Sequence, residues 1–185
     1  MRGYITLSRL NIFGASLLLH WSVILCVGVV LGAMGKQLLD AVLLITAYLG
    51  ILLLHEAGHA YVARRQQLRP RHIYIGLMHG RCECDAPSSL KDHAVLAWGG
   101  VLAQLAIALP LILLDRFTPL TSILSAGPVV SVFGYFNLLI ALFNLIPVPP
   151  YDGHIAWKII PVFFEELESR SRARRTAADL LRRMK

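Results

Sequence analysis

Long apolar stretches with few charges constrain this chain more than any other feature of its sequence. Hydrophobic residues make up 56% of the 185 residues and charged residues only 16%, and the mean hydropathy is +0.62. A soluble domain of this size needs more polar surface than such a composition supplies. Charges are scarce over four stretches, 17–34, 38–63, 94–114 and 120–147. Each is long enough to cross a bilayer as a helix, so we predict an all-α polytopic membrane protein with about four transmembrane helices.

The basic residues are distributed unevenly about these four predicted spans. Of the 18 Lys and Arg residues, only Lys36 and Arg116 fall on one side, while the rest lie near the N-terminus, around the 66–93 loop or in the tail. The positive-inside rule therefore predicts that both termini and the 66–93 loop are cytoplasmic. This topology, with attraction to anionic lipid, accounts for the net charge of +7 without any nucleic-acid partner.

Two segments outside the predicted spans have patterns of their own. Residues 72–77 and 81–84 have strand-like composition around a turn at 78–80, which predicts a small β-hairpin at the membrane surface. The three cysteines include only the short pair Cys82 and Cys84, for which we expect neither a disulfide nor a metal site. We divide the chain into a membrane core, 1–154, and a basic cytoplasmic tail, 155–185. The tail is predicted to form an amphipathic helix because apolar residues recur there at helical spacing between arginines, at Ala173, Ala177, Leu180, Leu181 and Met184.

The strongest chemical signal is the sequence His55-Glu56-Ala57-Gly58-His59. Residues four apart on a helix differ by about 40° around its axis, so both imidazoles can bind one metal ion with Glu56 beside them. This is the HExxH arrangement of zinc enzymes. The alternative is two interfacial histidines and a glutamate solvated by water. We favour the metal because ionisable groups within a membrane helix carry a large desolvation cost.

A catalytic zinc ion needs a third protein ligand and an open position for water. Prolines within 147–150 end the fourth predicted helix, and irregular backbone at membrane depth is tolerated where it is buried in protein or lines a wet cavity. His55 and His59 lie about 14 and 8 Å of helix before the cytoplasmic end of their span. Asp152 follows the helix break and is expected at the same depth, which makes it the candidate third ligand. Without the HExxH motif, an ordinary Asp-Gly turn would be preferred here.

A second motif, Asn144-x-x-Pro-x-Pro-Pro-x-Asp152-Gly153, follows the HExxH motif after about ninety residues. The pair resembles the site-2 protease family of intramembrane zinc metalloproteases. The resemblance extends to residues 14–21, which look like the first helix of the family, and to 98–104, which resemble a small-residue motif on its third helix. It thereby covers nearly the whole chain.

This resemblance implies a role for each of five residues. His55, His59 and Asp152 would bind Zn²⁺, and Glu56 would activate a zinc-bound water molecule. The residue types agree with these roles, because zinc lowers the pKa of bound water toward ~7 and a neighbouring carboxylate can accept the proton. Asn144 would donate a hydrogen bond to the oxyanion, with a hydrogen bond between helices as the alternative.

Several positions depart from the family pattern or have other expected roles. Gln104 stands where the family commonly has asparagine, which leaves its role open. His154 replaces a frequent second glycine and either adds a polar group near the metal or faces solvent. Gly99 and Gly100 are predicted to allow close helix packing, and His20 to make a hydrogen bond between helices, with a role in a proton path as the alternative. The sequence has no PDZ or cystathionine-synthase-like module, so regulation is expected from elsewhere, such as a membrane partner.

These observations predict an intramembrane zinc metalloprotease that cuts single-span membrane proteins near the cytoplasmic face of the bilayer. An edge of the 73–84 hairpin is expected to bind the unwound substrate by strand addition. The alternative is a zinc-binding membrane scaffold or chaperone without proteolytic activity, which would not need Glu56. A transporter is disfavoured because the sequence has no repeated halves.

Overall fold

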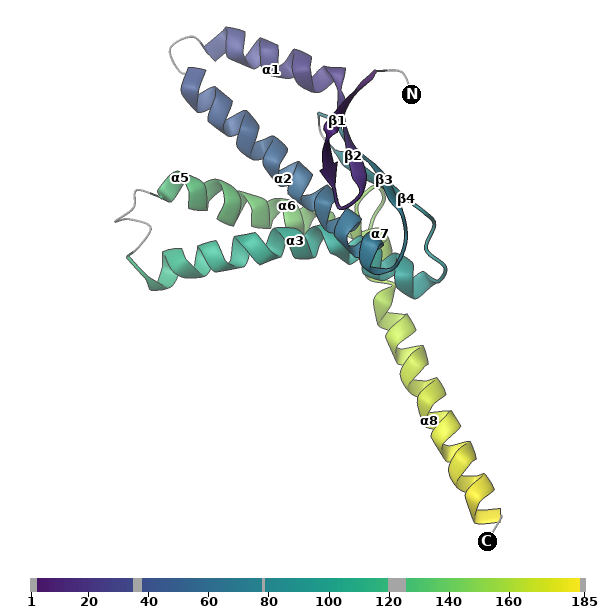
Figure 1. Cartoon of the computed structure of the whole chain (residues 1–185). Helices are drawn as coiled ribbons and strands as arrows, with labels where there is room; N and C mark the ends of the chain where they lie inside the picture. The colour runs from purple at the N-terminus through teal and green to yellow at the C-terminus, as the bar shows by residue number, and fades with distance from the viewer. Residues whose placement is uncertain (1–2, 35–37, 78, 120–125, 184–185) are drawn as a thin grey trace.

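The computed structural model describes residues 3–34, 38–77, 79–119 and 126–183. Helices dominate this part of the chain, and a small sheet lies beside them (Figure 1). In chain order the elements are β1 (Tyr4–Ile12), β2 (Ala15–His20), α1 (Trp21–Met34), α2 (Leu38–Arg65), β3 (Pro70–Ile75), β4 (Gly80–Cys84), α3 (Leu90–Phe117), α5 (Gly127–Val129), the π-helical stretch η2 (Val130–Phe136), α6 (Asn137–Asn144), α7 (Gly153–Ala156) and α8 (Ile159–Arg183).

Three helical segments in the described part of the chain are long and apolar enough to cross a membrane. They are 39–65, 90–117 and 127–144, the last formed by α5, η2 and α6 in succession. They correspond to the second, third and fourth predicted spans. The first residues of the fourth predicted span, 120–125, lie outside the described residues. So does Lys36, which the sequence places on the non-cytoplasmic side.

The first predicted span, 17–34, is wrong in its N-terminal part. Residues 17–20 belong to strand β2, and only the 14 residues of α1 are helical. The segment 14–21, expected to be helical, is therefore mostly a strand. A description as all-α is also too simple, because the chain is mostly helical with a small mixed sheet.

The sheet has four strands in the order β1-β2-β3-β4. The hairpin predicted between 72 and 84 is present as the antiparallel pair β3 and β4, although Met78 in its turn lies outside the described residues. Two N-terminal strands extend this hairpin. β2 runs parallel to β3, with Leu17 opposite Ile73 and Leu19 opposite Ile75, and β1 pairs with β2 through a turn at Phe13 and Gly14, both with positive φ.

The hydrophobic core explains why residues 15–20 form a strand. Ala15, Leu17, Ile73 and Ile75 are almost completely buried, and they pack against α2 through residues that include Leu52. Strand pairing places the alternate side chains of β2 and β3 on one face, which α2 covers. The sheet is thereby fixed beside the part of α2 that contains the HExxH motif.

Helices α2 and α3 approach each other closely at two glycines. A Cβ atom on Gly58 would collide with the main-chain carbonyl of Gly99, and one on Gly99 would lie 2.8 Å from the carbonyl oxygen of Gly58. Small residues permit such contact between backbones. This contact places the face of α3 that begins near Leu96 directly against the two histidines.

The C-terminal helix α8 projects away from the other helices and the sheet (Figure 1). Near its start, Glu166 accepts a 2.7 Å hydrogen bond from Lys91 of α3, and this ion pair holds the pKa of the exposed Glu166 carboxyl below its usual value. Of the apolar tail residues singled out above, only the side chain of Ala173 is described, and it is exposed. The side chains of Ala177, Leu180 and Leu181, together with all of Met184, lie outside the described residues.

Candidate metal centre

Three side chains from two distant segments converge on one point. The Nε2 atoms of His55 and His59 are 3.1 Å apart, and they lie 2.9 and 3.1 Å from Oδ2 of Asp152. Among the described residues, this is the group of histidine, cysteine and acidic side chains that is arranged to bind a metal ion. Helix α2 presents the two imidazoles on one face, as the spacing of four predicts.

The spacing of the three ligand atoms suits a zinc ion. Tetrahedral zinc sites have metal–ligand distances of about 2.0–2.2 Å, which separates neighbouring ligand atoms by about 3.3 Å. The observed separations of 2.9–3.1 Å need to widen by only a few tenths of an ångström. Two histidines and one carboxylate also leave a fourth position open, as in catalytic zinc sites.

A short loop and helix α7 position Asp152 after the chain leaves α6. Asp152 precedes α7, and a Cβ atom on Gly153 would collide with the main-chain carbonyls of Leu145 and Ile146, so the close fold of this loop requires glycine. Trp98 of α3 donates a 3.0 Å hydrogen bond from Nε1 to the carbonyl of the last α7 residue. The position of Asp152 is thus tied to α3.

The environment of Asp152 favours its ionised form. Burial alone raises the pKa of this carboxyl, but hydrogen bonds with His55 and His59 outweigh burial and hold the pKa well below its usual range. A carboxylate binds metal only after it has lost its proton. Asp152 is therefore in its metal-binding form at neutral pH.

Both imidazoles are held from behind by acceptors on α3. Nδ1 of His55 lies 3.0 Å from Oε1 of Gln104, and Nδ1 of His59 lies 2.8 Å from the carbonyl oxygen of Leu96. A carbonyl can only accept, so Nδ1 of His59 carries a hydrogen and Nε2 keeps a lone pair for a metal. Gln104 can fix His55 in the same way.

Glu56 is buried between α2 and strand β4. Glu56 is 5% exposed, and a Cβ atom on Gly80 would collide with the Glu56 carboxylate. The main chain of Cys82 forms a hydrogen bond to the same carboxylate. Glu56 thus lies between the three converging side chains and the edge strand of the sheet.

Gly100 of α3 lies against both imidazoles. A Cβ atom there would be 2.6 Å from Nε2 of His59 and 2.7 Å from Nδ1 of His55, so any side chain must displace the rings. Overpacking of this kind costs about 1–3 kcal/mol. We therefore expect Gly100→Ala to weaken metal binding about tenfold or more, measured by competition with a chromophoric chelator.

The matched control is Gly28→Ala on α1, where nothing lies within 4 Å of an added Cβ. This variant should bind metal with wild-type affinity. Wild-type affinity in Gly100→Ala as well would show that the rings are not confined as described.

Other residues singled out from the sequence lie outside this group. Asn144 is half-buried at the end of α6, and no hydrogen bond joins its side chain to the group within the described residues. His154 is exposed. The predicted helix-to-helix hydrogen bond of His20 is wrong, since His20 ends β2 and its Nδ1 lies 2.6 Å from Oγ of the neighbouring Ser22.

Cys82 and Cys84 are free cysteines that lie outside the converging group of His55, His59 and Asp152. Burial, followed by the nearby charge of Glu56, raises the pKa of the Cys82 thiol to about 12. Burial also raises the pKa of Cys84. Both thiols are therefore protonated at neutral pH in the metal-free protein.

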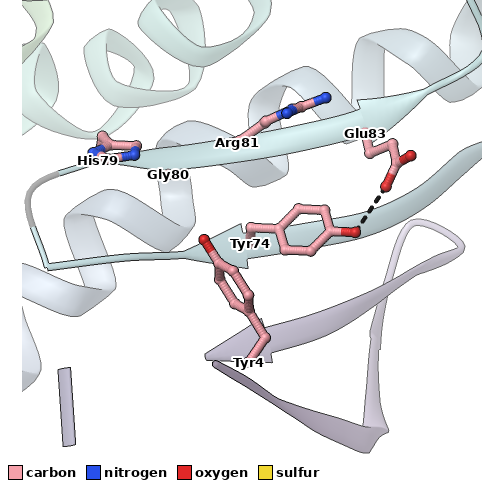
Figure 2. A pocket seen from close by; sticks show the side chains of 6 residues that line it. All are labelled: Tyr4, Tyr74, His79, Gly80, Arg81 and Glu83. Atoms are coloured by element: carbon pink, nitrogen blue, oxygen red, sulfur yellow. Dashed lines mark hydrogen bonds between the residues drawn. The ribbon is translucent and has the colours of Figure 1, made fainter. Parts of the chain in front are cut away.

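The face of the sheet opposite α2 carries a cavity of about 380 Å³ (Figure 2). Tyr4 and Tyr74 meet edge to face there with ring centroids 5.0 Å apart, and the hydroxyl of Tyr74 donates a 2.9 Å hydrogen bond to Glu83. Strand β4, at the edge of the sheet, supplies Arg81. The cavity is thus an open, polar and aromatic site beside an edge strand.

No family model matches the chain, but two proteins named as zinc metalloproteases are similar to it in sequence. Zinc metalloprotease MJ0392 of Methanocaldococcus jannaschii is 28% identical over 145 residues, which cover 77% of this chain and 42% of that protein. A Synechocystis sp. protein, sll0528, assigned by name to the zinc metalloproteases, is 32% identical over 124 residues, 63% of this chain and 32% of that protein. The chain thus spans less than half the length of either relative.

A solved structure shares the fold. The site-2 protease from Methanocaldococcus jannaschii superposes with a TM-score of 0.64 at 24% identity, over 85% of this chain and 71% of that one. The chain therefore has the fold of a site-2 protease. Together with the two relatives, this confirms the resemblance predicted from the motifs.

Proposed function

We propose that this chain, related to the site-2 proteases by sequence and fold, is an intramembrane zinc metalloprotease. The observation that carries the proposal is the convergence of His55, His59 and Asp152 beside the buried Glu56. Two of these ligands lie on a helix long enough to span a bilayer, and the third follows the end of another such helix. A peptide bond brought to this point would be cut within or at the surface of the membrane.

Each residue has a role that suits its chemistry. His55, His59 and Asp152 would hold Zn²⁺, which when bound polarises a carbonyl and lowers the pKa of a bound water molecule to about 7. The carboxylate of Glu56 would accept a proton from the attacking water and return it to the leaving amine. Asn144, assigned by the motif, would donate a hydrogen bond to the carbonyl oxygen as negative charge develops there.

The substrate that we propose is a single-span membrane protein, unwound and bound along β4. A peptide in a helix is shielded by its side chains and internal hydrogen bonds, whereas β4 is an edge strand beside which an extended peptide can pair. Gly80 and Cys82 of β4 both contact Glu56, so a peptide paired with β4 would pass beside that carboxylate. Alternate side chains of this peptide would face the cavity of Figure 2, near Arg81 and Tyr74.

The test is cleavage by the purified protein in detergent. The protein should contain zinc and cut members of a panel of single-span membrane proteins; a chelator should abolish cleavage, and added Zn²⁺ should restore it. A preparation without zinc would refute the proposal. A zinc-loaded protein that cuts nothing in a broad panel would instead favour the scaffold or chaperone.

We further propose a multi-pass protein with both termini and the 66–93 loop in the cytoplasm. Ser88 and Arg116 are exposed at opposite ends of α3, so cysteines placed there should report opposite sides of the membrane. In intact cells, a membrane-impermeant thiol reagent should label Arg116→Cys and leave Ser88→Cys unlabelled until the cells are lysed. Labelling of Ser88→Cys in intact cells would contradict this topology and place the 66–93 loop outside the cytoplasm.

Helix α8 would then lie on the cytoplasmic leaflet, as part of the 155–185 tail. Phe163, Phe164 and Leu167 are exposed near its start and can enter the lipid interface, while the arginines that follow can contact anionic headgroups. Cleavage near the cytoplasmic face would release a cytoplasmic fragment, as in regulated intramembrane proteolysis. A regulatory membrane partner would control this cleavage.

A further inference from the structure

Gln104 occupies an unusual place for a polar residue. It is completely buried in the apolar helix α3, and its Oε1 lies 3.0 Å from Nδ1 of His55. Its Nε2 has no hydrogen-bond partner among the described residues. The amide of Asn137 bonds to the main-chain carbonyl of Gln104, not to its side chain. Among the described residues, the Gln104 side chain thus has one hydrogen-bond partner, the imidazole of His55.

We infer that α3 fixes the orientation and tautomer of both imidazoles, with Gln104 as the positioning residue for His55. This inference rests on the proposed function, because it concerns how the chain prepares its histidines for a metal ion. It assigns Gln104 a role that the motif comparison left open.

The spacing along α3 supports this role. Leu96, Gly100 and Gln104 are four residues apart and so lie along one face of the helix. The carbonyl of Leu96 points toward the C-terminal end of α3, whereas the Gln104 side chain leans toward the N-terminal end. Both acceptors thus approach the level of Gly100, whose missing side chain leaves room for the two rings.

The unpaired Nε2 of Gln104 argues against a purely structural role. A buried amide group without a partner destabilises a protein, and an apolar side chain of similar length would avoid this cost. What an apolar side chain cannot supply is an acceptor for Nδ1–H of His55. With that acceptor in place, Nε2 of His55 keeps its lone pair directed toward Nε2 of His59 and Asp152.

The decisive variants keep the length of this side chain and change its chemistry. Gln104→Met removes the acceptor, and Gln104→Glu retains one. Loss of such an outer partner typically weakens metal affinity 10–100-fold, so we expect about this loss in Gln104→Met and an affinity within about threefold of wild type in Gln104→Glu. The metal-free Gln104→Met protein should melt close to the wild-type temperature, because removal of the unpaired Nε2 offsets the loss of the acceptor for Nδ1–H of His55.

The measurements use the full chain in detergent. Zn²⁺ affinity is obtained by chelator competition, Co²⁺ absorption reports the geometry of the centre, and thermal unfolding is followed after metal removal. The matched control is Asn137→Leu, which removes an equally buried amide that bonds to the Gln104 main chain but to neither imidazole. This control should keep wild-type Zn²⁺ affinity and Co²⁺ absorption.

The results separate this inference from the proposed function. Wild-type Zn²⁺ affinity in Gln104→Met, or an equal loss in Gln104→Met and Gln104→Glu, would overturn the positioning role while the metal centre stands. Absence of Zn²⁺ binding by the wild type would overturn both. If Gln104→Met does not fold, Gln104→Asn takes its place: it keeps the amide but is one methylene too short, and should show the same 10–100-fold loss.

Discussion

Replacement of Glu56 by glutamine is expected to slow peptide cleavage by about 10²–10⁴-fold and to leave metal binding intact. The amide has the shape of the carboxylate but cannot accept a proton from the attacking water. Glu56 is not one of the three converging ligands, so the metal should remain bound. The contacts of this side chain with β4 are also compatible with an amide, so folding should be retained.

The measurement compares cleavage rates and zinc content on the same detergent preparations. Asp40→Asn is the matched control, because it neutralises an exposed carboxylate at the start of the same helix. This control should cut substrate at the wild-type rate. Equal cleavage by wild type and Glu56→Gln would refute the assignment of Glu56 as the base, and lost zinc in Glu56→Gln would place Glu56 among the ligands instead.

The sequence predicted which three side chains converge because the positions of two of them, His55 and His59, depend on local helix geometry. The spacing of His55 and His59 puts both rings on one face of any helix, whatever the rest of the fold. Asp152 was predicted at the membrane depth of the two histidines, because the prolines within 147–150 must end the preceding membrane helix. Helix α6 indeed ends at Asn144, before these prolines.

The N-terminal strands could not be predicted in this way. Residues 15–20 continue into the apolar helix α1, so local hydrophobicity alone does not separate the strand from the helix. What makes them a strand is parallel pairing with β3, more than fifty residues away, and burial of Ala15 and Leu17 against α2. Tertiary contacts of this kind decide between strand and helix for short apolar segments.

The acceptors behind the imidazoles were missed for a similar reason. Gln104 was singled out because the family commonly has asparagine at this position, but its partner His55 lies 49 residues earlier on another helix. Leu96 contributes only its main-chain carbonyl, so its side chain gives no signal in the sequence. The close contact of Gly58 with Gly99 sets the register that brings both acceptors to the histidines, and such a register is a property of the packed helices.

Replacement of Asp152 by alanine is expected to weaken zinc binding as strongly as His59→Ala does. Zinc sites with four protein ligands bind with about 10–16 kcal/mol, or roughly 3 kcal/mol per ligand, so each variant should lose about 100-fold in affinity. Asp152 contacts both histidines through one oxygen, and no other acidic residue among those described joins this group.

His154→Ala provides the matched control, two residues from Asp152. Its side chain is exposed and lies outside the converging group, so zinc affinity should be unchanged. Chelator competition on wild type and the three variants gives the affinities directly. Full zinc occupancy and activity in Asp152→Ala would exclude Asp152 as the third ligand. A loss in His154→Ala under the same conditions would then identify the replacement, because His154 lies in the same short segment and carries a ring nitrogen able to bind zinc.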